Sequence, residues 1–184
     1  MFRDLPAYFG RLTGQFFRFV RTERGATAVE FALIAPPFLA TLIAILEVTL
    51  FLFAQQVLQN AAVQSGRLFM TGQAQNASTT QTQFANQVCP MVSAVFTCSA
   101  LMINVLDFAS GTGASAAAPT LTFNTQGQVT NSWSYTPGMP GDLMVVQLVY
   151  EWPIVSGPLG NVLPNLGNGH AEMMGVSAFR VEPY

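Results

Sequence analysis

The stretch Arg24-Gly25-Ala26-Thr27-Ala28-Val29-Glu30-Phe31-Ala32-Leu33 is the most informative part of the chain, because it joins an arginine-rich leader to a long apolar segment. One carboxylate, that of Glu30, lies just inside the apolar segment. A charged side chain at the entry to a bilayer is costly and is usually functional. Glu30 stands five residues after Gly25, which follows the charged pair Glu23 and Arg24. The stretch therefore predicts a membrane helix with a functional acid near its start.

Charge is distributed unevenly along the chain. Of its 184 residues only 9% are charged and 51% are hydrophobic, whereas soluble domains carry about 25% charged residues. The residues before Gly25 include five arginines and two acids, a net +3, and those after Phe53 include two arginines and five acids, a net −3. Arginines beside one end of a membrane span place that end in the cytoplasm. We therefore expect 1–25 to be a basic cytoplasmic leader and the C-terminal part to be periplasmic, as in a Gram-negative cell.

Residues 26–53 are predicted to form a transmembrane helix. From 31 to 53 the only charged residue is Glu47, and about 20 such apolar residues cross the hydrocarbon core. A removable secretory signal is the alternative, but its apolar core has only about 7–15 residues before a cleavage site of small residues. The stretch here is longer and continues into further helical sequence, so a retained anchor is favoured.

Pro36 and Pro37 interrupt the predicted span. Proline removes a helical hydrogen bond and clashes with the preceding turn, so we expect a kink or local unwinding over 32–36. The freed carbonyl groups need other partners in lipid. A neighbouring subunit helix and a tolerated kink in a lone helix are both consistent with the sequence.

Glu47 is the second acid of the apolar stretch. It lies 17 residues after Glu30, roughly 25 Å along a helix. It either reaches the far interface of the membrane or faces a partner helix, and the sequence favours neither reading.

The membrane helix is expected to continue into a head that comprises 54–184. Apolar residues recur at helical spacing over 54–70, with glutamine and asparagine opposite, and Gly72 is the expected stop. Residues 71–83 are predicted to be a polar linker, and a short second helix is predicted over 84–97.

The rest of the head, 101–184, is predicted to be rich in β-strands. We expect strands over 101–108, 143–152 and 171–181, a hairpin over 120–135, and loops over 109–119 and 153–170. Strands joined by hairpins form an antiparallel sheet, which the helices would cover on one face. The expected fold class is therefore α+β and pilin-like: a long N-terminal helix packed on a short helix and a small antiparallel sheet.

The strand 143–152 has two different faces. Met144, Val146, Leu148, Tyr150 and Trp152 point one way and predict a core face. The opposite face carries Gln147 and Glu151, which predicts that it is partly solvated.

Cys89 and Cys98 are the only cysteines. Two cysteines in a domain outside the cytosol are typical of one disulfide. Nine residues of unbroken helix would separate their Cα atoms by about 13 Å, whereas a disulfide needs less than about 7 Å. A bridged pair therefore requires the helix to break between them, near 96–97. A metal site is not expected, because the lone His170 is remote in sequence, and the spacing disfavours a redox catalyst.

The arrangement around Gly25 resembles the processing site of type IV prepilins and pseudopilins. In these families a membrane peptidase cuts after the glycine, and a glutamate stands fifth in the mature chain. Cleavage after Gly25 would make Ala26 the N-terminus and Glu30 its fifth residue. Glu30 would then offset the new ammonium group, its own or a neighbour's, because opposite charges attract strongly at low dielectric. The alternative is an unprocessed single-pass anchor with Glu30 in the headgroup region.

The stretch Glu30-Phe31-Ala32-Leu33-Ile34-Ala35-Pro36-Pro37-Phe38-Leu39 strongly resembles the TadE-like family, which comprises pseudopilins or minor pilins of the Tad (tight adherence, Flp pilus) system. The likeness continues along the helix to about Phe69 and includes the cysteine pair, the strand end Tyr150–Pro153 and the tail Phe179–Tyr184. Phe31 would be the sixth mature residue, where the major Flp pilins commonly have tyrosine. Those pilins are also short and lack a head, so both departures favour a minor component.

The resemblance implies a structural protein of the bacterial inner membrane that is processed by a prepilin peptidase and is needed to assemble the Tad pilus, which it can itself enter. It also implies the partners: the peptidase, other Tad pseudopilins, the major Flp pilin, the inner-membrane assembly platform and membrane lipid. On this chain Gly25 and Ala26 would flank the cut, and Glu30 would be the assembly residue.

Two other functions compete with this one. An adhesive or ligand-binding pilus tip would carry its contacts on the loops 109–119 and 153–170. An envelope enzyme is not expected. The best candidates for catalytic residues are His170 and the nearby Glu172, and no nucleophile, metal or phosphate motif occurs. No cofactor is expected, and nucleic acid is not an expected partner because no basic patch lies outside the leader.

Overall fold

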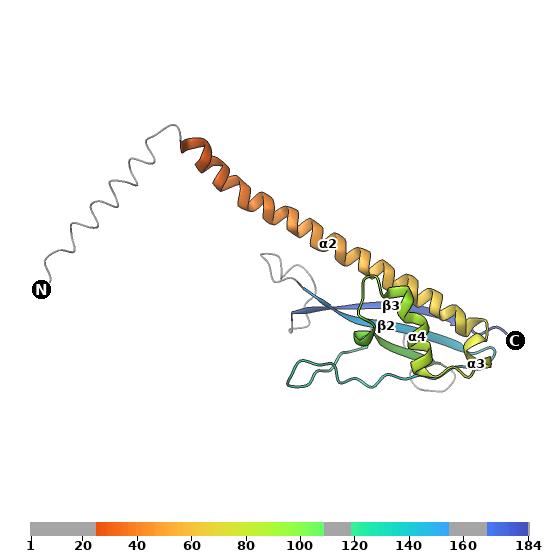
Figure 1. The fold of residues 1–184 in the computed structure, drawn as a ribbon. Coiled ribbons are helices and arrows are strands. Elements are labelled where there is room, and N and C mark those ends of the chain that lie inside the picture. Colours follow the sequence, from red (N-terminus) through yellow and green to blue (C-terminus); the bar gives the residue numbers. More distant parts are fainter. Residues whose placement is uncertain (1–24, 109–118, 155–168, 184) are drawn as a thin grey trace, which may run out of the picture. The chain divides into compact units, whose positions relative to one another are not determined.

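The computed structural model describes residues 25–108, 119–154 and 169–183 (Figure 1). The chain divides into two compact units, Met1–Leu46 and Glu47–Tyr184, each considered by itself. The described residues contain a long apolar helix, two shorter helices, a 3₁₀ turn and a three-stranded antiparallel sheet. The predicted α+β class is therefore confirmed.

The helix α2 extends from Ala26 to Met70. Within the helix no glycine occurs before Gly66, and alanine and leucine, both strong helix formers, recur throughout. The helix ends where the sequence predicted: Gly72 adopts a left-handed backbone with φ 71° and its N–H donates to the Phe69 carbonyl at 3.1 Å. Glycine adopts this conformation without the steric cost that other residues meet, which explains the stop.

The polar segment after Gly72 is more ordered than predicted. It holds the short helix α3, Gln73–Asn76, and the first turn of α4, Gln81–Val92. A capping box starts α4: the Thr80 hydroxyl accepts the Gln83 N–H, and the Gln83 side chain accepts the Thr80 N–H. This box is why α4 begins before the predicted start at 84.

The sheet has the strand order β1-β2-β3, with β1 at Met102–Asp107, β2 at Leu143–Pro153 and β3 at His170–Arg180. Both pairings are antiparallel, and Gln147 of β2 pairs with Asn104 of β1 and with Val176 of β3. The three predicted strands are confirmed. The predicted hairpin over 120–135 is reduced to one bridge, between Phe123 and Val129, and to a parallel bridge between Tyr135 and Val105. Most of both predicted loops lies outside the described residues: 109–118 of the first loop and 155–168 of the second.

The core lies between the sheet and the helices α2 and α4. The alternate β2 residues that were predicted to face the core do so, and they meet apolar side chains of both helices: Ala54, Leu58, Ala61, Ala62 and Phe69 from α2, and Phe84, Val88 and Val92 from α4. Two aromatic contacts join these elements. The ring centroids of Phe69 on α2 and Phe84 on α4 lie 4.9 Å apart, and those of Phe96, after α4, and Tyr150 on β2 lie 4.8 Å apart.

The helix α2 also covers the outer edge of β3. The Gln55 amide donates to the Met174 carbonyl at 2.8 Å. The Gln59 side chain donates to the Val176 carbonyl at 2.8 Å and accepts the Val176 N–H at 3.0 Å. An unpaired strand edge can recruit another strand, so these glutamines both attach the helix and block this part of the edge.

The face of β2 that carries Gln147 and Glu151 was predicted to be partly solvated, and at Gln147 it is not. Gln147 is only 2% exposed, and its Oε1 accepts a hydrogen bond of 2.9 Å from Asn104 Nδ2 on β1. The Asn104 Oδ1 in turn accepts the Ser134 N–H at 2.9 Å. A buried amide is tolerated when its polar atoms are bonded, and a partner 43 positions away cannot be inferred from strand alternation.

Candidate functional site

The described residues begin at Gly25, and Ala26 is the first residue of α2. Glu30 and Phe31 lie one turn further on, and both are exposed, Phe31 to 73%. Ala26 and Glu30 stand four residues apart, about 6 Å along the helix axis. An acid at this position is available to a cation on the same helix end or on a neighbouring chain.

The N-terminal part of α2 presents its large apolar side chains outward. Those exposed within 29–46 are Val29, Phe31, Leu33, Ile34, Phe38, Leu39, Leu42, Ile43, Ile45 and Leu46. Among the described residues, α2 is the one helix long and apolar enough to cross a membrane, and its most apolar window has a mean hydropathy of 2.2 with 6% of the window buried. The long helix therefore fits a membrane-anchored protein.

Pro36 and Pro37 lie inside α2, and helical structure continues through both. The predicted local unwinding is thus not observed, and the kink stays a prediction. Because proline has no N–H, the carbonyls of Ala32 and Leu33 lose their usual helical donors. The next polar side chain, that of Thr41, donates to the Pro37 carbonyl at 2.8 Å, which satisfies its hydroxyl inside the apolar segment.

Cys89 and Cys98 form a disulfide with their Cα atoms 5.5 Å apart. The helix α4 ends at Val92, and the 3₁₀ turn η2 at Cys98–Ala100 leads into β1. The helix therefore breaks between the cysteines, as the predicted bridge required, although it ends earlier than 96–97. The bond fixes the last turn of α4 to the start of the sheet.

His170 and two acids gather near one end of the sheet. Glu151 pairs with Glu172 across β2 and β3, and Pro153 pairs with His170. Burial raises the pKa of Glu172, and its Oε1 is buried without a hydrogen-bond partner. Within the described residues no group of three His, Cys, Asp or Glu side chains is placed to hold a metal ion.

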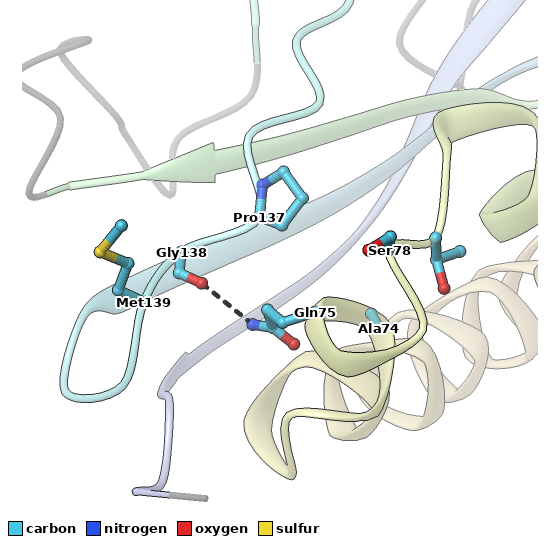
Figure 2. Close-up of a pocket in the computed structure, with 7 residues that line it drawn as sticks. Ala74, Gln75, Ser78, Pro137, Gly138 and Met139 are labelled. Carbon is cyan, nitrogen blue, oxygen red and sulfur yellow. Dashed lines mark hydrogen bonds between the residues drawn. The ribbon is translucent and has the colours of Figure 1, made fainter.

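A pocket that sequence patterns did not indicate lies where α2 ends (Figure 2). It has a volume of about 390 Å³ and is lined from α3 and the residues after it, and from the turn before β2: Ala74, Gln75, Ser78, Thr79, Pro137, Gly138 and Met139. The Gln75 Nε2 donates to the Gly138 carbonyl at 3.3 Å across it. Its two walls are about 60 residues apart in the chain, so only the tertiary fold reveals it.

Residues 25–67 match the model of a family described as TadE-like protein. The match covers Gly25 and Glu30, the exposed apolar segment and most of the packed part of α2, and it confirms over these residues the resemblance seen in the sequence. Neither the curated proteins nor the solved structures contain a match to this chain.

Proposed function

We propose that this chain is a membrane-anchored minor pilin, or pseudopilin, that takes part in the assembly of a Tad-type (Flp) pilus after cleavage behind Gly25. One observation carries the proposal. A single helix, Ala26–Met70, has an outward-facing apolar N-terminal part and a C-terminal part built into the core of the head, and the TadE-like match covers both. Such a helix holds a folded head and leaves an apolar surface for lipid or for neighbouring helices.

Glu30 supplies the specificity of assembly in this proposal. Cleavage after Gly25 creates an ammonium group on Ala26, one helical turn from the Glu30 carboxylate. Inside a bilayer this pair of charges is far more favourable than either charge alone. When apolar helices pack side by side, the Glu30 of one subunit meets the ammonium of its neighbour and fixes their relative position along the helix axis.

The proposed role is structural and needs no catalysis. Its partners are a prepilin peptidase, other Tad pseudopilins, the major Flp pilin, the inner-membrane assembly platform and membrane lipid. The arginines of the leader favour a cytoplasmic N-terminus and a periplasmic head. The head can then enter the base or the body of an extracellular pilus together with the subunits that its helix contacts.

The proposal is tested by replacing Glu30 in cells that make the pilus. Glu30→Ala should reduce piliation at least about tenfold, because a lost low-dielectric charge pair exceeds 1.4 kcal/mol, while the amount of protein in the membrane stays unchanged. The matched control is Glu182→Ala, which removes an exposed acid of the C-terminal tail and should leave piliation intact. Normal pili with Glu30→Ala would show that the acid has no role in assembly.

A further inference from the structure

The pocket between α3 and the turn 137–139 belongs to the head alone and plays no part in the proposed assembly by the membrane helix. Its volume of about 390 Å³ lies within the usual range for small-ligand sites, about 300–1,000 Å³. Figure 2 shows Gln75 and Ser78 on one side of it and Pro137, Gly138 and Met139 on the other.

The lining mixes polar and apolar surface and carries no charged side chain. Gln75, Ser78 and Thr79 contribute an amide and two hydroxyl groups, which both donate and accept hydrogen bonds. Pro137 and Met139 contribute apolar surface, and the Met139 side chain is 74% exposed. Such a lining suits a neutral ligand that has hydroxyl groups and an apolar C–H face, because it has no charged side chain to balance a phosphate or a metal ion.

The side-chain amide of Gln75 is not fully hydrogen-bonded. Its Nε2 makes one long bond of 3.3 Å to the Gly138 carbonyl, and its Oε1 is buried with no partner. A buried acceptor without a donor is unfavourable. Gln75 Oε1 is therefore the acceptor in this wall that a ligand hydroxyl group would satisfy, once a small shift of the side chain uncovers it while Nε2 stays on the Gly138 carbonyl.

Ser78 is in a conformation that glycine normally takes. Its N–H donates to the Gln75 carbonyl at 3.0 Å and the Thr79 N–H donates to the Ala74 carbonyl at 2.9 Å, the pattern of a Schellman motif at the end of α3. Ser78 has φ 48°, where a side chain is disfavoured. Backbone strain of this kind clusters at functional sites. Here the strained residue contributes a hydroxyl group to the lining of the pocket.

We infer that this pocket binds a neutral sugar residue, such as one from a surface polysaccharide. The sugar hydroxyl groups would donate to Gln75 Oε1 and to the Gly138 carbonyl, and would accept from the Ser78 hydroxyl. The apolar face of the ring would pack against Pro137 and Met139. The head then has a binding function that is separate from the assembly function of the membrane helix.

The test uses the full chain in lipid nanodiscs, with ¹³C-labelled methionine methyl groups observed by NMR during titration with neutral and charged sugars. Glucose, galactose and N-acetylglucosamine are the neutral probes, and glucuronate and glucosamine are the charged ones. At least one neutral sugar should shift the Met139 signal, which is assigned from Met139→Ala, and should saturate it in the millimolar range typical of a weak single-residue contact, about 1–10 mM. The charged sugars should shift it less.

Two variants test whether the pocket binds sugar through its lining residues. Gln75→Ala should weaken sugar binding about tenfold, whereas Gln73→Ala, an exposed glutamine of the same short helix, should leave it unchanged. Ser78→Gly should raise the unfolding temperature, because glycine relieves the strain at φ 48°, and should at the same time weaken sugar binding about threefold or more.

The opposite results would overturn the inference. They are the absence of any Met139 shift with every neutral sugar, an equal loss of binding with Gln73→Ala and Gln75→Ala, or a Ser78→Gly protein that gains stability and binds sugar as before. A failure of this kind leaves piliation and its dependence on Glu30 untouched, because the two experiments measure different parts of the chain.

Discussion

Gly175 allows the closest approach of α2 to the sheet. A methyl group on its Cα would lie 2.5 Å from the carbonyl oxygen of Leu58 and 2.8 Å from the carbonyl carbon. These are backbone atoms of a helix in the core, and they cannot move aside without shifting α2 from β3. Glycine at this position is therefore a packing requirement, although its backbone conformation is ordinary.

Gly175→Ala should accordingly lower the free energy of unfolding by about 1–3 kcal/mol, the usual cost of overpacking. Urea denaturation of the protein in detergent, followed by circular dichroism, measures the change. Gly127→Ala is the comparison, because the added methyl group meets open space there and only the backbone strain at φ 76° remains. A Gly175→Ala protein as stable as the wild type would show that α2 lies further from β3.

Glu172 gives the head a predictable dependence on pH. Burial disfavours the charged carboxylate and raises the pKa of Glu172 above its ordinary value. The folded state then holds the proton at pH values where the unfolded state has released it, so the contribution of Glu172 to stability is most favourable below about pH 4.5 and falls as pH rises through the folded-state pKa.

Glu172→Gln should therefore raise the unfolding temperature at pH 7 and flatten its decline between acidic and neutral pH. Thermal unfolding followed by fluorescence at several pH values measures both effects, with Glu182→Gln in the exposed tail as the control. A Glu172→Gln protein that declines with pH as steeply as the wild type would mean that other groups set the dependence.

At the scale of elements, the sequence was most informative where a strong period extends over many residues. The long helix, its end at Gly72 and the strands β2 and β3 follow from such patterns. The hairpin expected over 120–135 is shorter than predicted because side chains replace much of the strand ladder. The Thr122 N–H donates to Asn131 Oδ1 at 2.7 Å, and the Gln128 N–H donates to Asn124 Oδ1 at 2.8 Å. Asparagine and threonine compete with the backbone in this way.

Sequence patterns likewise identified some of the candidate sites and missed others. Gly25, Glu30 and the cysteines were visible because a motif or a count identifies them. The pocket and the buried pair Asn104–Gln147 were not, because each depends on residues that only the fold brings together.

The disulfide is the covalent link between α4 and the sheet. It closes a loop over a sequence separation of 9, for which the loss of chain entropy predicts a stabilisation of about 2–3 kcal/mol. The double variant Cys89→Ser and Cys98→Ser should lose about this much in urea denaturation. Amide hydrogen exchange should become faster in α4 and remain slow in the packed part of α2. Equal loss of protection in both helices would show that the bond supports the whole head.

At the scale of the whole molecule, the exposed apolar segment and the folded head have opposite surface requirements. The segment 26–53 keeps large apolar side chains outward as far as Phe53, and the buried residues of α2 begin at Ala54. Lipid, or the helices of other subunits, must cover the first part, whereas the second is covered by the chain itself. This division, together with the TadE-like match over 25–67, supports the proposed anchor and assembly role.

The central claim is that a peptidase converts Glu30 from an acid behind a leader into the fifth residue of a mature chain. The most direct measurement is the intact mass and N-terminal sequence of the protein extracted from the membranes of cells that make the pilus. The account predicts that the mature protein begins at Ala26 and that Gly25→Leu blocks this conversion. Mature protein that still begins at Met1, with pili present, would contradict it.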